Sequence, residues 1–133
     1  LNSKHDWALT HVLYESVNGV GVQSQGLYRI SPLIKKINPL TIFRIRANLT
    51  VQQEKRGRTI FHIDYDHKTT MTTSIFYMNT TNGPTILEDG TEIDCRANRL
   101  VTYPYNTFHS GVRCTDQLYR IVINLNYFID RNL

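Results

Sequence analysis

The sequence contains only two cysteines, Cys95 and Cys114, among its 133 residues. A small secreted domain that depends on disulfides usually carries more, so we expect both thiols to be reduced. No apolar run approaches the roughly 18 residues that a membrane span needs, and no basic stretch followed by an apolar core marks a signal peptide. These absences argue against a disulfide scaffold and a membrane protein, and they predict a soluble, cytoplasmic protein.

A strong excess of one charge sign is also lacking. The chain has 15 Lys and Arg residues and 11 Asp and Glu residues, which gives a formal net charge of +4. This excess favours an anionic partner but is too small to distinguish an acidic small molecule from nucleic acid. The length allows one domain with one core. We therefore expect a single domain over residues 1–133, and because the chain begins at Leu1 rather than at a methionine, a truncated N-terminus stays open.

Glycine and proline interrupt the chain at short intervals, and no internal repeat is present, as expected of an all-β domain. Apolar and polar residues alternate over residues 41–52 and again over residues 118–128, so each of these predicted strands has one apolar and one polar face. The first 25 residues have weak periodicity, and none of the predicted strands lies there. Further strands are predicted over residues 59–65, 72–79, 92–94 and 99–103.

In the strand over residues 41–52, the alternation places Phe43 and Ile45 on the apolar face, with Ile42 and Arg44 on the other. Many short strands joined by tight turns, with polar residues lining a second face, suit a double-stranded β-helix, or jelly roll, whose interior or mouth holds a ligand. The competing interpretation is a flat sheet whose polar face is solvated.

One short helix is predicted before these strands. Ser31 is the expected N-cap, Pro32 occupies the first helical position, and Asn38 and Pro39 end the helix. The predicted fold class is therefore mainly β, a double-stranded β-helix with a short N-terminal helix.

The segment His62-Ile63-Asp64 carries the most chemical information. On a strand, residues two apart project from the same face roughly 6 to 7 Å apart, so an imidazole and a carboxylate can converge on one ion. Two imidazoles and one carboxylate on one side of an octahedron leave three positions open, which is the arrangement of non-haem Fe(II) oxygenases. The pair alone is weak evidence, because a chain with five histidines can hold this spacing by chance. His109, just before the last strand, is the candidate third ligand.

Four further motifs accompany these three residues. They are Ile-Phe-Tyr-Met-Asn at residues 75–79, Asn-Gly-Pro-Thr at residues 82–85, Asn-Arg-Leu-Val-Thr-Tyr-Pro at residues 98–104 and Phe-His-Ser-Gly at residues 108–111. With these motifs, the chain from residue 59 to the C-terminus resembles the Fe(II)/2-oxoglutarate-dependent dioxygenase superfamily, particularly its prolyl-hydroxylase-like branch.

The resemblance implies a role for five residues. His62, Asp64 and His109 would be the catalytic Fe(II) ligands. Arg120, whose planar guanidinium can hold a carboxylate bidentately, would bind the distal carboxylate of 2-oxoglutarate, and Tyr77 would hydrogen-bond the same group. The implied reaction uses O2 and 2-oxoglutarate, with ascorbate as an accessory reductant, to hydroxylate an unidentified substrate, such as a peptidyl proline, and releases succinate and CO2.

The chain departs from the family pattern at two positions. Many members have Ser or Thr two residues after the arginine, where this chain has Val122. Some members also have a tyrosine near Gln52, which makes Asn48 and Gln52 candidate pocket residues. Asp66 and His67 are interpreted as loop residues near the entrance rather than as extra ligands.

Each assignment has a structural alternative. His62 can be a hydrogen-bonded sheet histidine with Asp64 as a turn acceptor, Arg120 can pair with Asp116, and Tyr77 can be a core aromatic residue. Two other functions stay open: a cupin-like metal-binding jelly roll that does not use 2-oxoglutarate, and a non-enzymatic β-domain that binds carbohydrate or nucleic acid. Neither the substrate nor the oligomeric state follows from the sequence.

Overall fold

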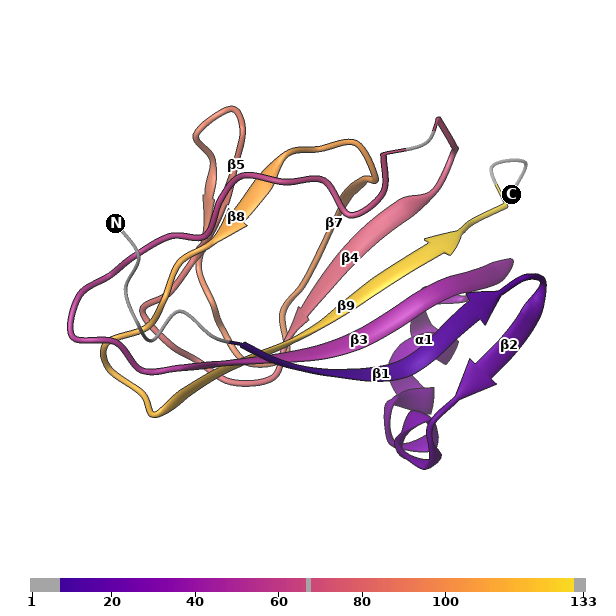
Figure 1. Cartoon of the computed structure of the whole chain (residues 1–133), viewed down its shortest axis with the longest axis horizontal. Coiled ribbons are helices and arrows are strands. Elements are labelled where there is room, and N and C mark those ends of the chain that lie inside the picture. Colours follow the sequence, from indigo (N-terminus) through magenta and orange to yellow (C-terminus); the bar gives the residue numbers. More distant parts are fainter. Residues whose placement is uncertain (1–7, 67, 131–133) are drawn as a thin grey trace.

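The computed structural model describes residues 8–66 and 68–130. Over these residues the chain forms two antiparallel sheets, with strand orders β2-β1-β3-β9-β4-β7 and β6-β5-β8 (Figure 1). The strands are β1 Ala8–Val17, β2 Val20–Gln23, β3 Thr41–Val51, β4 Thr72–Tyr77, β5 Thr85–Leu87, β6 Glu92–Ile93, β7 Leu100–Pro104, β8 His109–Gly111 and β9 Tyr119–Phe128. The prediction of a mainly β fold is confirmed.

The outer face of the larger sheet packs against α1 Ser31–Ile37, the one α-helix of the described residues. Pro32 lies in its first turn, and Asn38, with a left-handed φ of 52°, follows its last residue, as the sequence predicts. Figure 1 shows α1 beside β1 and β3, on the side away from β5 and β8. The apolar residues that form this core are Leu13, Ile45, Ile123, Leu125 and Tyr127, with Leu33, Ile34 and Ile37 packed against them.

The predicted cap of this helix is wrong in detail. A 3-10 helix over Gln25–Ile30 runs directly into α1, so Ser31 is already helical and Ile30 precedes the first residue of α1. The serine that caps is Ser24, whose hydroxyl accepts a hydrogen bond from the backbone N–H of Gly26 at 3.2 Å. The sequence pattern marked the correct helix but not the start of the longer helical segment.

The hairpin β1–β2 was not among the predicted strands. Residues Asn18 and Gly19 form its turn, with φ angles of 50° and 78°. Two consecutive positive φ angles are typical of the tight hairpin turn that Asn-Gly favours. This dipeptide was therefore a usable signal, but the mostly exposed side chains of β1 and β2 weaken the alternation on which the strand predictions rest.

Strands β3 and β9 pair along nearly their whole length, with a register shift between Ile42 and Arg44. Because this bulge adds one residue, Ile42 joins Ile45 at the apolar core, and the ring of Phe43 packs edge-on against Tyr65 instead. The prediction that Phe43 shares the apolar face with Ile45 is therefore wrong.

The opposite face of the larger sheet carries polar residues and faces the smaller sheet. Asn48 on β3 and Asn124 on β9 line a cavity of about 230 Å³ together with Thr85 on β5 and His109 on β8. The polar faces of the two long strands thus line the interior rather than bulk solvent. This observation favours the jelly roll over the flat, solvated sheet.

Cys95 and Cys114 are both free, as expected from the sequence, and both are buried. Within residues 8–66 and 68–130, no helix has the length and apolar character needed to cross a membrane.

Candidate metal centre

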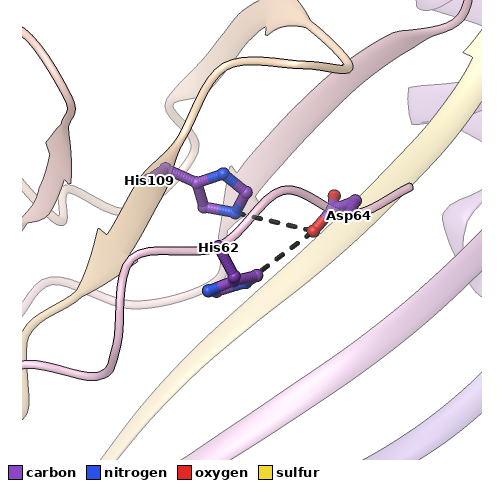
Figure 2. Close-up of side chains that lie close together, drawn as sticks. All are labelled: His62, Asp64 and His109. Carbon is purple, nitrogen blue, oxygen red and sulfur yellow. Dashed lines mark ion pairs between the residues drawn. The ribbon is translucent and has the colours of Figure 1, made fainter. Parts of the chain in front are cut away.

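His62, Asp64 and His109 lie together between the two sheets (Figure 2). Their ligand atoms are all within 4.8 Å of one another. Oδ1 of Asp64 is 3.5 Å from Nε2 of His109 and 3.9 Å from Nε2 of His62. The three residues that the sequence predicts as ligands, one of them distant from the others in the chain, therefore point their donor atoms at one another.

The backbone fixes the two histidines side by side. His62 and His109 form an isolated antiparallel bridge in which each N–H donates to the other's carbonyl at 3.0 Å. The predicted strand over residues 59–65 is not formed, because in this part of the chain only isolated bridges pair with the strand beside it, one at Arg58 and one at His62. Beyond the bridge the chain bends at Asp64, whose carbonyl accepts a hydrogen bond from Nη2 of Arg44 at 3.2 Å.

Backbone carbonyls set the tautomer of both imidazoles. Nδ1 of His62 lies 3.0 Å from the carbonyl oxygen of Ile60, and Nδ1 of His109 lies 3.1 Å from that of Thr107. A carbonyl can only accept, so in the neutral rings Nδ1 carries the proton and Nε2 keeps its lone pair. Metal-binding histidines are commonly oriented in this way by their second nitrogen.

The carboxylate is oriented by a residue that sequence reasoning missed. Oδ2 of Asp64 accepts a hydrogen bond from Nδ2 of Asn126 at 3.0 Å, and the same amide nitrogen lies 3.0 Å from Oγ1 of Thr73. Asn126 is only 1% exposed. Its place on the polar face of the last strand was the available signal, but its partner is distant in the sequence.

The two histidines differ in how far they are buried. His109 is 3% exposed, and this burial lowers its pKa, although the Asp64 carboxylate acts in the opposite direction. The side chain of His62 is half exposed. The neutral imidazole of His109 has its lone pair available at physiological pH, and the set of two nitrogens and one carboxylate oxygen fits a divalent transition-metal ion.

Arg120 lies in the lining of the same 230 Å³ cavity as His62 and His109. Its side chain is buried, with Nε donating to the carbonyl of Gly83 at 2.8 Å and Nη2 to Oγ1 of Thr85 at 3.1 Å. Within the described part of the chain, Arg120 does not pair with Asp116, whose carboxylate accepts from the backbone N–H of Asn82.

Tyr77 reaches the cavity only through Thr85. Tyr77 is fully buried, its hydroxyl donates to Oγ1 of Thr85 at 2.7 Å, and its ring lies 5.8 Å from Cζ of Arg120. Burial raises the pKa of the Tyr77 hydroxyl, which therefore stays protonated. Thr85 accepts from both Tyr77 and Arg120 and itself lines the cavity. Thr85 is a second residue whose place in the site the sequence analysis missed, although it ends the Asn-Gly-Pro-Thr motif.

Of the other residues predicted near the site, Asn48 lines the cavity, whereas Gln52 and Asp66 are exposed. Asn48 lines the cavity, and its Oδ1 accepts from the hydroxyl of Thr10 at 2.8 Å. Gln52 is exposed and donates instead to the carbonyl of Thr115. Asp66 is exposed, and His67 lies outside the described residues.

No protein-family model matches the chain, and no curated protein sequence matches it. Its structure is nevertheless similar to solved ones. An oxidoreductase of the 2OG-Fe(II) oxygenase family from Burkholderia pseudomallei has a TM-score of 0.68 and 9% identity, over 91% of this chain and 66% of that chain. SnoN, a non-heme alpha-ketoglutarate-dependent epimerase from nogalamycin biosynthesis, has a TM-score of 0.61 and 18% identity, over 80% of this chain and 57% of that chain. A cupin domain from Bordetella pertussis Tohama I has a TM-score of 0.55 and 10% identity, over 95% of this chain and 98% of that chain.

These likenesses confirm the predicted jelly-roll fold. At such low identity they extend to the fold alone, which plain cupins share with 2-oxoglutarate-dependent enzymes. The chain spans about two thirds of the Burkholderia protein and 57% of SnoN. The prolyl-hydroxylase-like branch stays a prediction.

Proposed function

We propose that this chain is an Fe(II)- and 2-oxoglutarate-dependent dioxygenase that hydroxylates its substrate. The observation that carries the proposal is one cavity lined by His62, His109 and Arg120, with Asp64 beside the two imidazoles. Neither the metal trio nor a buried arginine is specific alone. Together they provide a cation site and a carboxylate site in one cavity, which is what a chelating dicarboxylate requires.

In this function His62, Asp64 and His109 would hold Fe(II). The bound metal would supply the activation of O2, with 2-oxoglutarate as the source of electrons. Overall, one oxygen atom of O2 enters a substrate C–H bond as a hydroxyl, and the other enters succinate as the 2-oxo acid loses CO2. Asn126 and the carbonyls of Ile60 and Thr107 keep the ligands oriented, so the metal site is formed before the ion binds.

Arg120 would bind the distal carboxylate of 2-oxoglutarate. Two of its interactions, with Gly83 and Thr85, fix the guanidinium while leaving further N–H donors for a ligand. Because Arg120 is only 6% exposed, a carboxylate beside it is shielded from water, and the charge-assisted hydrogen bonds gain strength. Val122, also in the lining, offers the apolar methylenes of the ligand a matching wall.

The cupin-like alternative differs at Arg120. A jelly roll that uses the metal without 2-oxoglutarate needs no buried carboxylate site in this cavity. The two functions therefore make opposite predictions for an arginine substitution that leaves the metal ligands intact.

The test is 2-oxoglutarate binding by the Fe(II)-loaded protein without oxygen, followed by succinate formation once O2 is admitted. Arg120→Met should weaken 2-oxoglutarate binding by about tenfold or more while leaving Fe(II) binding unchanged, because a charged hydrogen-bonding partner is lost. The matched control is Arg96→Met, at an exposed position away from the cavity. Unchanged 2-oxoglutarate affinity in Arg120→Met would favour the cupin-like alternative.

A further inference from the structure

A second cavity, of about 260 Å³, adjoins the first. The two cavities share His62, Asn48 and Asn124 in their linings, so they meet at the metal centre. The second cavity additionally has Arg44 and Arg46 in its wall, and we call it the arginine pocket. Nothing in the proposed binding of Fe(II) and 2-oxoglutarate uses these two arginines as ligands.

Arg46 has hydrogen-bonding capacity that the protein leaves unused. Its Nη2 pairs with Oε1 of Glu15 at 3.1 Å, but its Nε is buried and has no hydrogen-bond partner within the described part of the chain. Asn124 lies directly opposite Arg46 in the β3–β9 register, and its buried Oδ1 also has no hydrogen-bond partner among the described residues. Buried polar atoms are normally paired, so the unpaired Nε–H donor of Arg46 in the wall of this pocket indicates a ligand with an acceptor oxygen. The unpaired Oδ1 of Asn124 is itself an acceptor, so its partner must be a separate donor group.

Charge indicates what kind of ligand fits. When the metal and 2-oxoglutarate are bound, Asp64 and the chelating carboxylate offset the charge of the divalent ion. Glu15 offsets one of the two guanidinium groups in the arginine pocket. One positive charge remains uncompensated next to the metal centre, in a partly buried site where unscreened charge is costly.

We propose that the arginine pocket is the substrate site and that it selects a substrate carrying an oxyanion, either a carboxylate or a phosphate group. The assignment of this oxyanion-bearing molecule as the substrate rests on the proposed function, whereas the oxyanion binding itself does not. Arg46 is the main ligand through its Nε. Arg44 donates to the carbonyl of Asp64, and so contributes mainly its charge.

The geometry also separates the two anions. Arg120 lies in the first cavity and the Arg44–Arg46 pair lies in the second, with His62 lining both. A 2-oxoglutarate molecule held by Arg120 therefore leaves the arginine pocket open. The oxyanion of the substrate would fix its position so that a neighbouring carbon faces the metal centre.

The test uses two probes, sodium acetate and inorganic phosphate, titrated into the Zn(II)-loaded protein saturated with 2-oxoglutarate and, in parallel, into the zinc-free protein. Zn(II) is redox-inactive and keeps the cosubstrate intact. Two readouts are used: the NMR signal of the Arg46 Nε–H group locates the probe in the wild type, and calorimetric titration gives the probe affinity of the wild type and of every variant. We expect at least one probe to shift this signal saturably in both samples. Tighter acetate binding would indicate a carboxylate substrate, and tighter phosphate binding a phosphorylated one.

Matched variants make the test specific. Arg46→Gln should weaken probe binding at least fivefold, and Glu15→Gln should tighten it about twofold because it removes a competing carboxylate. Arg46→Lys keeps the charge, guards against a folding defect and should give an intermediate affinity. Arg96→Gln, at an exposed position outside the lining of the pocket, should have no effect.

Two results would overturn the inference. One is equal probe affinity in the wild type, Arg46→Gln and Arg46→Lys. The other is saturation of the Arg46 signal by 2-oxoglutarate itself, which would make the arginine pocket the cosubstrate site. By contrast, probe binding at Arg46 in a protein that binds neither metal nor 2-oxoglutarate would support the oxyanion site and contradict only the proposed function.

Discussion

Strands β3 and β9 have two faces of opposite character. On the outer face, Ile45 and Leu125 are buried against α1 in an apolar core. On the inner face, Asn124 and Asn126 are opposite Arg46 and Arg44, and several of these polar atoms lie against the metal centre. The comparison indicates that the outer face stabilises the fold whereas the inner face, which holds buried polar atoms without partners, is adapted to ligands.

The largest expected effect is on the outer face. Leu125→Ala should lower the free energy of unfolding by about 2 to 5 kcal/mol, because it leaves a cavity in a well-packed core. Metal affinity of the folded protein should not change. Urea unfolding and metal titration of the same variant measure both quantities. Leu9→Ala, at a position that is 58% exposed, is the control and should change stability by no more than about 0.5 kcal/mol.

A substitution at an equally buried position on the inner face should act mainly on metal affinity. Asn126→Ala removes the donor that orients Asp64, so we expect metal affinity to fall by about 10- to 100-fold. Calorimetric titration with Mn(II) measures this effect. If Asn126→Ala bound Mn(II) as tightly as the wild type, the orienting role of Asn126 would be wrong.

Within the inner face, Thr85 tests whether the hydrogen bonds that hold Arg120 contribute to 2-oxoglutarate affinity. Thr85→Val keeps the shape of the side chain but leaves the Tyr77 hydroxyl and Nη2 of Arg120 without their shared acceptor. We expect 2-oxoglutarate affinity to fall by about tenfold, since a displaced or unpaired arginine binds a carboxylate less well. Tyr77→Phe leaves the bond between Arg120 and Thr85 intact and should have a smaller effect in the same binding assay. A larger effect of Tyr77→Phe would mean that Tyr77 contacts the ligand directly.

The smallest expected effect concerns pH. Burial places the pKa of His109 below the ordinary value of 6.5, so the unfolded chain takes up this proton at a higher pH than the folded protein does. The contribution of His109 to stability is therefore present above about pH 6.5 and is lost as the pH falls toward the lower, folded-state pKa. Urea unfolding of the chelator-treated protein should show this loss, and His109→Gln should reduce the slope. A wild-type stability that rises on acidification would contradict the assignment.

The sequence predicted the parts of the fold that local patterns determine. Alternation located β3 and β9 and assigned a polar face to each, and the proline and asparagine around α1 marked both of its ends to within a residue. The bulge at Ile42 and Arg44 escaped prediction, because one inserted residue reverses the faces without changing the composition.

The site was predictable where its residues belong to motifs, and not where tertiary contacts decide. His62, Asp64 and His109 do come together, but not by the predicted strand geometry, since a bond from Arg44 holds the bend at Asp64. Asn126 and Thr85 act through partners distant in the sequence. Alternation placed Asn126 on the correct face but could not identify its partner.

The most direct test of the central claim is the metal stoichiometry of the purified chain. Calorimetry with Mn(II), or with Fe(II) in the absence of oxygen, should show one ion bound per chain. Binding should be lost in His109→Ala and retained in His11→Ala, which replaces an exposed histidine of β1 that contacts Ser24. Equal binding by His109→Ala and the wild type would contradict the account, because the ion would then be held somewhere other than between His62, Asp64 and His109.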